Sequence, residues 1–222
     1  MDSAWERLLD VERLIQQHFP ESVLVGGTAA ALHARHRLSL DVDSVIENLR
    51  ERFSEVLTEL ENMAGWQTRR VRPPVLILGN FEGVDVGIRQ LIRKAPLETE
   101  SIGGIIVPTR GEMLRIKAWL VVTRNALRDY IDFCALAHIL EENFEADMAA
   151  MDFYYPQPDA CDSTLQQLAK QLAEPRPYDF DPAREELSGW RGLIAPWSDW
   201  EYDQTYCRTL SGRVMDLLVS DK

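Results

Sequence analysis

The sequence predicts an α+β protein: a mixed β-sheet flanked by helices, followed by an α-helical C-terminal part. Short strand-like apolar runs gather between residues 22 and 108, amphipathic helical patterns lie among them, and the periodicity from Gly111 onward is helical. The chain has 222 residues, 45% of them hydrophobic and 27% charged, as in soluble globular proteins. We therefore expect an α/β core over residues 1–110 and a helical domain over residues 111–222.

The individual elements follow from local patterns. A helix is expected from about Ala4 to His18, because its apolar residues recur at helical spacing. A short strand, "ESVLVGG", leads directly into the helix "TAAALHA", and the strand "LSLDVDSV" precedes the amphipathic helix "IENLRERFSEVLTELENMA". Four further strands are expected: "WQTRRVR", "PVLILGN", "GVDVGIRQL" and "GGIIVPT". Gly79-Asn80 and Glu82-Gly83 supply turn residues between the second and third of them.

The C-terminal part is expected to be wholly helical. The segments "EMLRIKAWLVVT" and "ALRDYIDFCALAHILEENF" have the period of buried helices. From Pro156 onward, prolines interrupt the sequence, and we expect three further helices there, whose packing involves Trp190, Trp197 and Trp200.

The formal charge is unevenly distributed along the chain. The total is −12; residues 1–140 hold 17 Lys and Arg against 19 Asp and Glu, and residues 141–222 hold 7 against 17. Because nucleic-acid affinity depends on Lys and Arg, binding over the whole surface is disfavoured, although a local basic patch in the first part is compatible with these numbers. The acidic region is either a solvated face or a surface that meets a basic partner.

Cysteine usage and hydropathy indicate a cytoplasmic protein. The three cysteines, Cys134, Cys161 and Cys207, are scattered and unpaired in spacing, which is typical of reduced thiols. The acidic, amphipathic N-terminus is unlike a secretory signal, and no apolar run reaches the length of a membrane span. We therefore expect no membrane partner.

Three aspartates in strand-like segments indicate a metal site. Asp41 and Asp43 lie two residues apart, so their side chains would project to the same face of a strand, and Asp85 is flanked by valines in another strand. Carboxylates this close repel one another unless cations lie between them, and Mg²⁺ prefers such oxygen ligands. The alternatives are a strand-end acid that caps a helix, for Asp41 or Asp43, and a turn-flanking acid, for Asp85.

A glycine turn precedes this acidic strand. Gly26, Gly27 and Thr28 join a strand to a helix, where glycine allows the backbone to approach a phosphate and the helix N-terminus offers free N–H groups. A turn of this kind alone is weak evidence. Followed about a dozen residues later by Asp-x-Asp, it indicates nucleotidyl or phosphoryl transfer with two metal ions.

Two blocks of sequence resemble the AbiEii/AbiGii-type nucleotidyltransferase toxins, a family of the DNA-polymerase-β-like nucleotidyltransferase superfamily. The first, "VGGTAAALHARHRLSLDVD", is similar to the family's glycine pair and its Arg-x-Ser-x-Asp-x-Asp run, which here ends in Arg37, Ser39, Asp41 and Asp43. The second, "KAWLVVTRNALRDYIDF", resembles the family's Lys, Arg and Arg-Asp-x-x-Asp signature. The resemblance covers roughly residues 20–140. The sequence has Gly-Gly-Thr where the wider superfamily often has Gly-Ser, and it has Ser44 where an apolar or aromatic residue commonly follows the second aspartate.

The resemblance implies a nucleotidyltransferase-type fold and an enzyme of the EC 2.7.7 type with a two-metal mechanism. It implies that Asp41, Asp43 and Asp85 hold two Mg²⁺ ions, which Mn²⁺ can replace, and that Asp85 also orients or deprotonates the attacking hydroxyl. The implied acid of the second block is Asp132. The implied nucleotide-binding residues are Gly26, Gly27, Thr28, Ser39, Lys117, Arg124, Arg128 and Asp129.

The second block has simpler interpretations as well. Lys117 would be an ordinary exposed lysine, and Arg128 and Asp132 an i,i+4 surface pair. In a continuous helix, the face would be shared by Lys117, Arg124, Arg128 and Asp132. If residues 123–125 break the helix instead, Asp129 and Asp132 lie together on a second helix by i,i+3 spacing. His33 and His36 have no metal-ligand spacing, which argues against a zinc site.

Three functions are compatible with these residues. The first is a toxin of a toxin–antitoxin or phage-defence pair, which uses an NTP to modify RNA, including tRNA, and has a cognate antitoxin as partner. Transfer to a small hydroxylated acceptor of the antibiotic type is the second, and an inactive nucleotide-binding or interaction module is the third. For RNA, the candidate contacts are Arg35, Arg37, Arg69, Arg70, Arg72, Arg89, Arg93 and Lys94.

Overall fold

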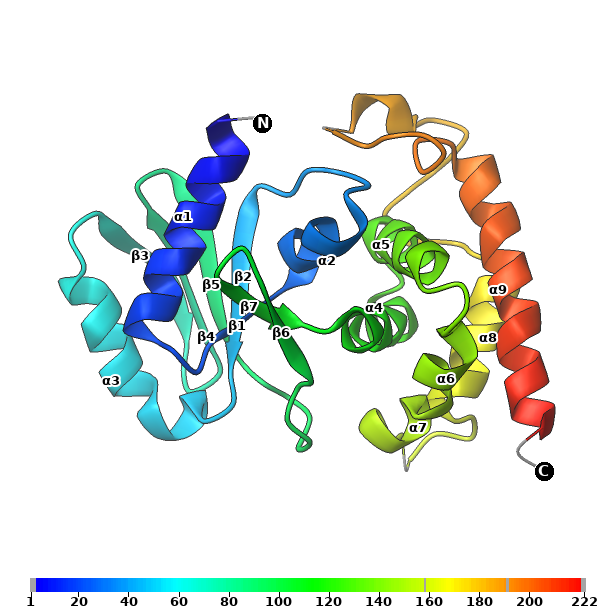
Figure 1. Cartoon of the computed structure of the whole chain (residues 1–222), viewed down its shortest axis with the longest axis horizontal. Coiled ribbons are helices and arrows are strands. Elements are labelled where there is room, and N and C mark those ends of the chain that lie inside the picture. Colours follow the sequence, from blue (N-terminus) through cyan, green and yellow to red (C-terminus); the bar gives the residue numbers. More distant parts are fainter. Residues whose placement is uncertain (1–2, 158, 191, 221–222) are drawn as a thin grey trace. The chain divides into compact units, whose positions relative to one another are not determined.

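A mixed sheet of five strands in the order β1-β2-β5-β4-β3 lies in the N-terminal half of the chain (Figure 1). β2 runs parallel to β5, whereas the other neighbouring pairs are antiparallel. The strands are β1 (Val23–Val25), β2 (Asp41–Ile46), β3 (Trp66–Arg72), β4 (Leu76–Phe81) and β5 (Val84–Gln90). A separate hairpin consists of β6 (Thr99–Ile102) and β7 (Ile105–Pro108).

The computed structural model describes residues 3–157, 159–190 and 192–220, and its chain divides into two units. Unit 1 comprises residues 1–32 and 38–109, and unit 2 comprises residues 33–37 and 110–222. The sequence-based boundary near residue 110 lies next to this division. Residues 33–37 were not expected in the second unit.

The sheet of unit 1 has one apolar face, which helices cover. Val42, Ser44 and Ile46 are buried along β2, and α1 (Ser3–His18) and α3 (Leu49–Asn62) pack on the sheet. Both helices are amphipathic, so each buries one apolar side. On α1, Glu12 is also buried, and Ser44 donates a hydrogen bond to its carboxyl group at 3.0 Å. The apolar face therefore directs the alternate residues of β2 to the opposite face.

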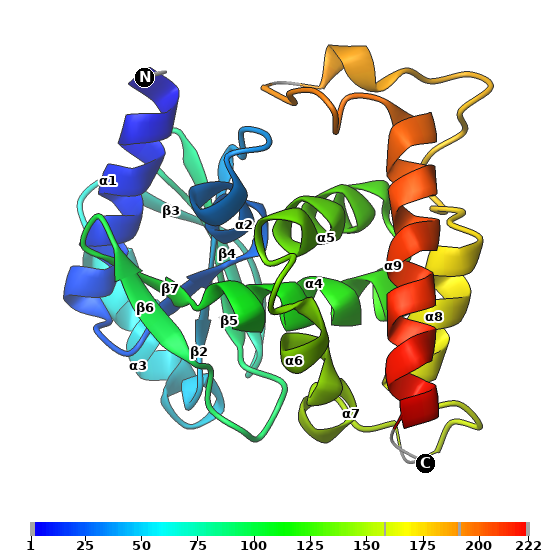
Figure 2. The same ribbon diagram turned by 45° about the vertical axis from the view of Figure 1, so that its right-hand side comes forward.

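Unit 2 contains a helical bundle. Helix α5 (Leu127–Ile139) is buried along most of its length, and α8 and α9 lie side by side (Figure 2). The ring of Tyr130 on α5 packs edge-on against Trp200 on α9, with centroids 6.3 Å apart. The other helices of the bundle are α4 (Arg110–Arg124), α6 (Phe144–Ala149), α7 (Met151–Tyr154), α8 (Thr164–Ala173) and α9 (Trp200–Ser220).

The architecture confirms the predicted α+β fold and most of its elements. It differs after Pro156, where the described residues form two α-helices and a short 3₁₀ helix (Leu187–Gly189) instead of three helices. The helix expected over residues 126–144 ends at Ile139, and a turn precedes α6, which begins at Phe144. The structure also adds β6, whose sequence "TESI" lacks a strand pattern. No helix in the described part is long and apolar enough to cross a membrane, and the three cysteines are free.

Candidate active site

The three predicted metal ligands share one face of the sheet in unit 1. Asp41 on β2 is the register partner of Asp85 on β5, and Asp43 is the partner of Gly87. Paired residues of adjacent strands point to the same side, and residues two apart along a strand do as well. Asp41, Asp43 and Asp85 therefore lie on the face opposite to the buried Val42 and Ser44, as the alternation in the sequence predicts.

The glycine turn lies against the second of these aspartates. Gly26 has a φ of +73° and begins helix α2 (Gly26–Ala34). A Cβ atom at Gly26 would lie 3.2 Å from Cβ of Asp43, so this close approach favours glycine on both steric and conformational grounds. The hydroxyl of Thr28 donates to the main-chain oxygen of Asp41 at 2.6 Å, which ties the first turn of α2 to β2. The free N–H groups of this helix end suit a phosphate.

Two arginines and an asparagine contact the acids. Nε of Arg89 donates to Oδ1 of Asp43 at 3.2 Å. Oδ1 of Asp85 accepts from Nη1 of Arg69 at 2.6 Å and from Nδ2 of Asn80 at 2.7 Å. The side chains of Arg69 and Asp85 are 58% and 52% exposed, so their ion pair contributes at most about 1 kcal/mol and is readily exchanged.

The chemistry of this acidic face suits a hard divalent cation. Its donors are carboxylate oxygens, and Gly26 and Gly87 leave space beside Asp43: a Cβ atom at Gly87 would lie 2.6 Å from Oδ1 of Asp43. As the side chains stand, the described residues contain no group of three or more His, Cys, Asp or Glu placed to hold a metal ion. Oδ1 of Asp85 accepts from Arg69 and Asn80 in this arrangement.

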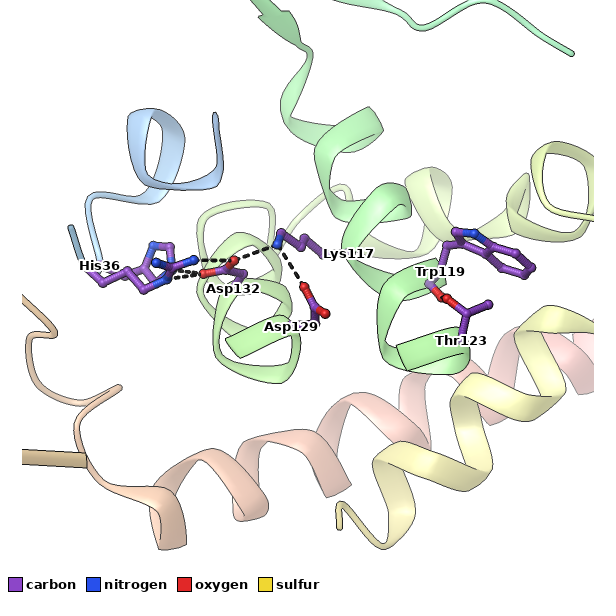
Figure 3. Close-up of polar contacts among 7 residues, drawn as sticks. His36, Lys117, Trp119, Thr123, Asp129 and Asp132 are labelled. Carbon is purple, nitrogen blue, oxygen red and sulfur yellow. Dashed lines mark hydrogen bonds and ion pairs between the residues drawn. The ribbon is translucent and has the colours of Figure 1, made fainter. Parts of the chain in front are cut away.

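A second polar cluster, inside unit 2, contains the lysine and both acids of the second sequence block (Figure 3). Nζ of Lys117 on α4 lies 3.0 Å from Oδ1 of Asp129 and 2.7 Å from Oδ2 of Asp132, both on α5. Oδ1 of Asp132 lies 2.6 Å from Nε2 of His36 and 2.6 Å from Nε of Arg37, and Oδ2 accepts from Nη2 of Arg37 at 2.9 Å. Sequence analysis identified Asp132 but not its contact with His36.

Charge and hydrogen bonding together decide the ionisation of Asp132, which is fully buried. Burial alone would raise its pKa. The charges of Lys117 and Arg37 and the hydrogen bonds from His36 and Arg37 outweigh burial, so the pKa of Asp132 lies well below its usual value. Because Oδ1 is an acceptor for His36, the neutral imidazole would carry its proton on Nε2.

The break between α4 and α5 separates the remaining predicted residues. Asn125 has a φ of +51° and lies between the two helices, so Asp129 and Asp132 are on the second helix, as one of the alternatives predicted. Arg124 and Arg128 are exposed. The surface interpretations of Lys117 and of an Arg128–Asp132 pair are wrong, because the side chains of Lys117 and Asp132 are 3% and 0% exposed.

The site residues thus form two groups, each within its own unit. Gly26, Gly27, Thr28, Asp41, Asp43 and Asp85 belong to unit 1, as does Ser39, which is half-buried ahead of β2. Lys117, Asp129 and Asp132 belong to unit 2, together with Arg124 and Arg128 on its surface. The specific catalytic and nucleotide-binding roles assigned to these residues stay predictions.

Solved structures share this fold. JHP933 from Helicobacter pylori has a TM-score of 0.61 at 16% identity, with 100% of this chain and 96% of that chain covered. A candidate nucleotidyltransferase from H. pylori has a TM-score of 0.56 at 15% identity, covering 100% and 99%. The antibiotic-resistance factor ANT(2'')-Ia has a TM-score of 0.52 at 14% identity, covering 70% of this chain and 95% of that one. The fold is therefore of the nucleotidyltransferase type.

Sequence relatives are long proteins matched over a short part. The mycolic acid-containing lipids exporter MmpL11 of Mycolicibacterium smegmatis is 28% identical over 131 residues, 56% of this chain and 13% of the exporter. The heme uptake protein MmpL11 of Mycobacterium tuberculosis is 32% identical over 108 residues, 44% of this chain and 11% of that protein. The chain thus spans about a tenth of the length of these relatives. No protein-family model matches the chain, and the AbiEii/AbiGii resemblance stays a prediction.

Proposed function

We propose that the chain is a magnesium-dependent nucleotidyltransferase that transfers a nucleotide from an NTP to an acceptor hydroxyl. The observation that carries the proposal is the placement of Asp41, Asp43 and Asp85 on one sheet face, with the N-terminal turn of α2 packed against Asp43. Three carboxylates on one sheet face are donors that suit a hard divalent cation, and such a cation also binds substrate phosphates. The nucleotidyltransferase-type fold supports the same conclusion.

Each residue has a role that its position allows. The first turn of α2, with Gly26, Gly27 and Thr28, would bind the triphosphate through main-chain N–H groups. Asp41 and Asp43, with Asp85, would hold Mg²⁺ or Mn²⁺, which when bound supplies charge stabilisation to the attacking and leaving oxygens. Asp85 would accept the proton of the attacking hydroxyl. The acceptor oxygen forms a bond to the α-phosphorus, the bond to the bridging oxygen breaks, and pyrophosphate leaves.

The proposed acceptor is RNA, including tRNA. The edge strand β3 exposes Arg69, Arg70 and Arg72, and Arg70 and Arg72 pair in register with Leu78 and Leu76 of β4. This register places Arg70 and Arg72 on the same face as the acids. A row of arginines beside a transfer site suits a polyanionic acceptor, despite the acidic total charge.

The proposed biological role is that of a toxin paired with an antitoxin in phage defence, and it depends on the AbiEii/AbiGii resemblance. A small hydroxylated acceptor is the second candidate, favoured by the structural likeness to the antibiotic-resistance factor ANT(2'')-Ia. An inactive nucleotide-binding module is the third.

One experiment separates these functions. The protein is incubated with Mg²⁺, each α-labelled NTP and total RNA, beside the double variant Asp41→Asn, Asp43→Asn. Asp10→Asn is the matched control, since Asp10 is an exposed acid of the same unit paired with Arg13 at 2.7 Å. Label in RNA that requires Asp41 and Asp43 supports the first function. Label only on an added aminated polyol supports the second, and NTP binding without transfer of label contradicts the proposed activity.

The RNA acceptor has its own test. The double variant Arg70→Glu, Arg72→Glu reverses charge on the acid-bearing face without altering Arg69, which contacts Asp85. RNA labelling is expected to fall by about 100-fold, because several phosphate contacts are lost, while NTP binding is unchanged. Unchanged RNA labelling in this variant would exclude the arginine row as the acceptor track.

A further inference from the structure

The carboxylate of Asp132 has no acceptor capacity left for a substrate or a metal ion. A carboxylate offers about four lone-pair sites to donors. Asp132 receives the Nε and Nη2 groups of Arg37, Nε2 of His36 and Nζ of Lys117, at distances between 2.6 and 2.9 Å. The side chain is also fully buried. This geometry does not suit a residue that exchanges ligands or protons during a reaction.

The partners of Asp132 identify what it holds. His36 and Arg37 belong to residues 33–37, the short segment that joins unit 2 although its neighbours in sequence belong to unit 1. The segment is also fixed through its backbone, because the N–H of Ile194 donates to the main-chain oxygen of His36 at 3.0 Å. Asp132 on α5 therefore binds this segment through the side chains of His36 and Arg37.

The backbone of the segment is held in an unfavourable conformation. Arg35 has a φ of +52°, which costs a non-glycine residue about 1 kcal/mol or more. Such a conformation persists where surrounding contacts determine it, and the next two residues make the contacts with Asp132. The ion pairs of Asp132 thus maintain a strained turn directly after α2.

We propose that Asp132 is a positioning residue for the transfer reaction: it holds residues 33–37 and thereby sets the entry into β2. This inference depends on the proposed function for its kinetic consequence. The segment connects α2, which begins at the glycine turn, to β2, which begins at Asp41, four residues after Arg37. Four residues span at most about 14 Å, so a released segment shifts the residues that precede Asp41.

The test compares two buried ion pairs of unit 2. In Asp132→Asn, the charge that holds Arg37 is removed without a change of shape. Glu112→Gln is the matched control, because Glu112 is a fully buried acid of the same unit, paired with Arg115 at 3.1 Å. Hydrogen exchange is measured at the amides of residues 35–42, together with Mn²⁺ binding and the kinetics of nucleotide transfer.

In Asp132→Asn, exchange at residues 35–42 is expected to rise at least about tenfold, since local opening is no longer opposed by the ion pairs. The kcat should fall by about 100-fold with KM for the NTP within about threefold, as for displaced catalytic groups. Glu112→Gln should leave exchange in this segment unchanged. Arg37→Gln should reproduce the effect if Asp132→Asn does not fold, and Arg37→Lys, which keeps the charge, should restore part of it.

The outcomes separate this inference from the proposed function. A lower kcat with unchanged exchange at residues 35–42 would make Asp132 a participant in the reaction and would overturn the inference. Unchanged exchange and unchanged kcat in a folded variant would overturn it as well. If the wild type transfers no nucleotide, the proposed function fails, while the exchange measurement still decides whether Asp132 holds residues 33–37.

Discussion

Asp41 and Asp85 are register partners on the parallel strands β2 and β5, and both residues are exposed. The carboxylate of Asp85 accepts from Arg69 and Asn80, and the main-chain oxygen of Asp41 accepts from Thr28. The acidic face is thus partly neutralised by the protein's own cations. A divalent ion bound by the carboxylates would replace their contacts with the arginine side chains.

Replacing Gly87 with alanine should impair the acidic face without unfolding the protein. The new Cβ would lie 2.6 Å from Oδ1 of Asp43 and 3.2 Å from the Leu78 side chain, so the carboxylate must move. We expect Mn²⁺ affinity to fall by about tenfold or more, because metal ligands tolerate little displacement. Titration calorimetry measures this. Gly212→Ala is the control, since a Cβ there meets nothing within 4 Å, and equal losses in both variants would contradict the prediction.

Removing the cation that contacts Asp85 should strengthen metal binding. In Arg69→Gln, a divalent ion no longer competes with the guanidinium 2.6 Å from Oδ1 of Asp85. Because this exposed pair contributes up to about 1 kcal/mol, we expect Mn²⁺ affinity to rise by about threefold to fivefold. Electron paramagnetic resonance of Mn²⁺ provides the measurement. Arg70→Gln removes the same charge from the neighbouring position and should change affinity less; equal gains would indicate a general charge effect.

Replacing Lys117 with methionine should destabilise unit 2. The lysine lies between two buried carboxylates, those of Asp129 and Asp132, and its removal leaves buried negative charge without one of its cations. Breaking a buried pair in this way costs about 3–5 kcal/mol of unfolding free energy. Lys170→Met removes a largely exposed lysine paired with Asp162 and should cost about 1 kcal/mol or less. Chemical denaturation distinguishes the two, and a similar loss in both would refute the buried role of Lys117.

Stability should decrease as pH rises toward neutrality and beyond, because two buried carboxyl groups prefer to stay protonated. Burial raises the pKa of Glu12 from 4.5 to about 8, although hydrogen bonds from Ser44 and Gln16 lower it in part, and burial with the nearby Asp199 charge raises the pKa of Asp203 from 3.8 to about 8. Between the unfolded and folded values the folded state binds more protons, so each group stabilises the fold at low pH and loses this contribution as pH rises through about 8.

For Glu12 alone, the free energy of unfolding should fall by about 2 kcal/mol between about pH 6 and pH 8. Glu12→Gln should remove this part of the pH dependence, since the amide does not ionise, while it still accepts from Ser44. Urea denaturation at a series of pH values measures the slope. An unchanged slope in Glu12→Gln would show that the carboxyl group ionises freely in the folded protein.

The face of the sheet on which the aspartates lie is predictable from the sequence, whereas the side chains that contact these aspartates are not. Alternation in "LSLDVDSV" and "GVDVGIRQL" places the aspartates opposite to the apolar residues, and this pattern is local. The contact of Asp85 with Arg69 depends on a register shift between Thr68 and Arg70, which no propensity encodes. Likewise, β6 is not predictable from its residues "TESI", which are mostly exposed and form a strand by pairing with β7.

The cluster around Asp132 shows the same limit over a longer range. The spacing of Lys117, Asp129 and Asp132 was visible in the sequence, whereas His36 lies 96 positions from Asp132 and meets it only in the folded chain. Burial also contradicts the surface interpretation of Lys117 and Asp132. Lys117 and Asp132 form a buried hydrogen-bonded cluster instead. Lys117, Arg37 and His36 together offset the desolvation of the Asp132 carboxylate.

The inclusion of residues 33–37 in the second unit limits how this protein can be divided. A recombinant fragment that starts at Arg110 would lack His36 and Arg37. Of His36, Arg37 and Lys117, which all contact Asp132 in the whole chain, such a fragment would keep Lys117. Unit 2 is therefore not formed by one continuous stretch of sequence. A chimaera that exchanges unit 2 between homologues would also have to exchange the five residues 33–37.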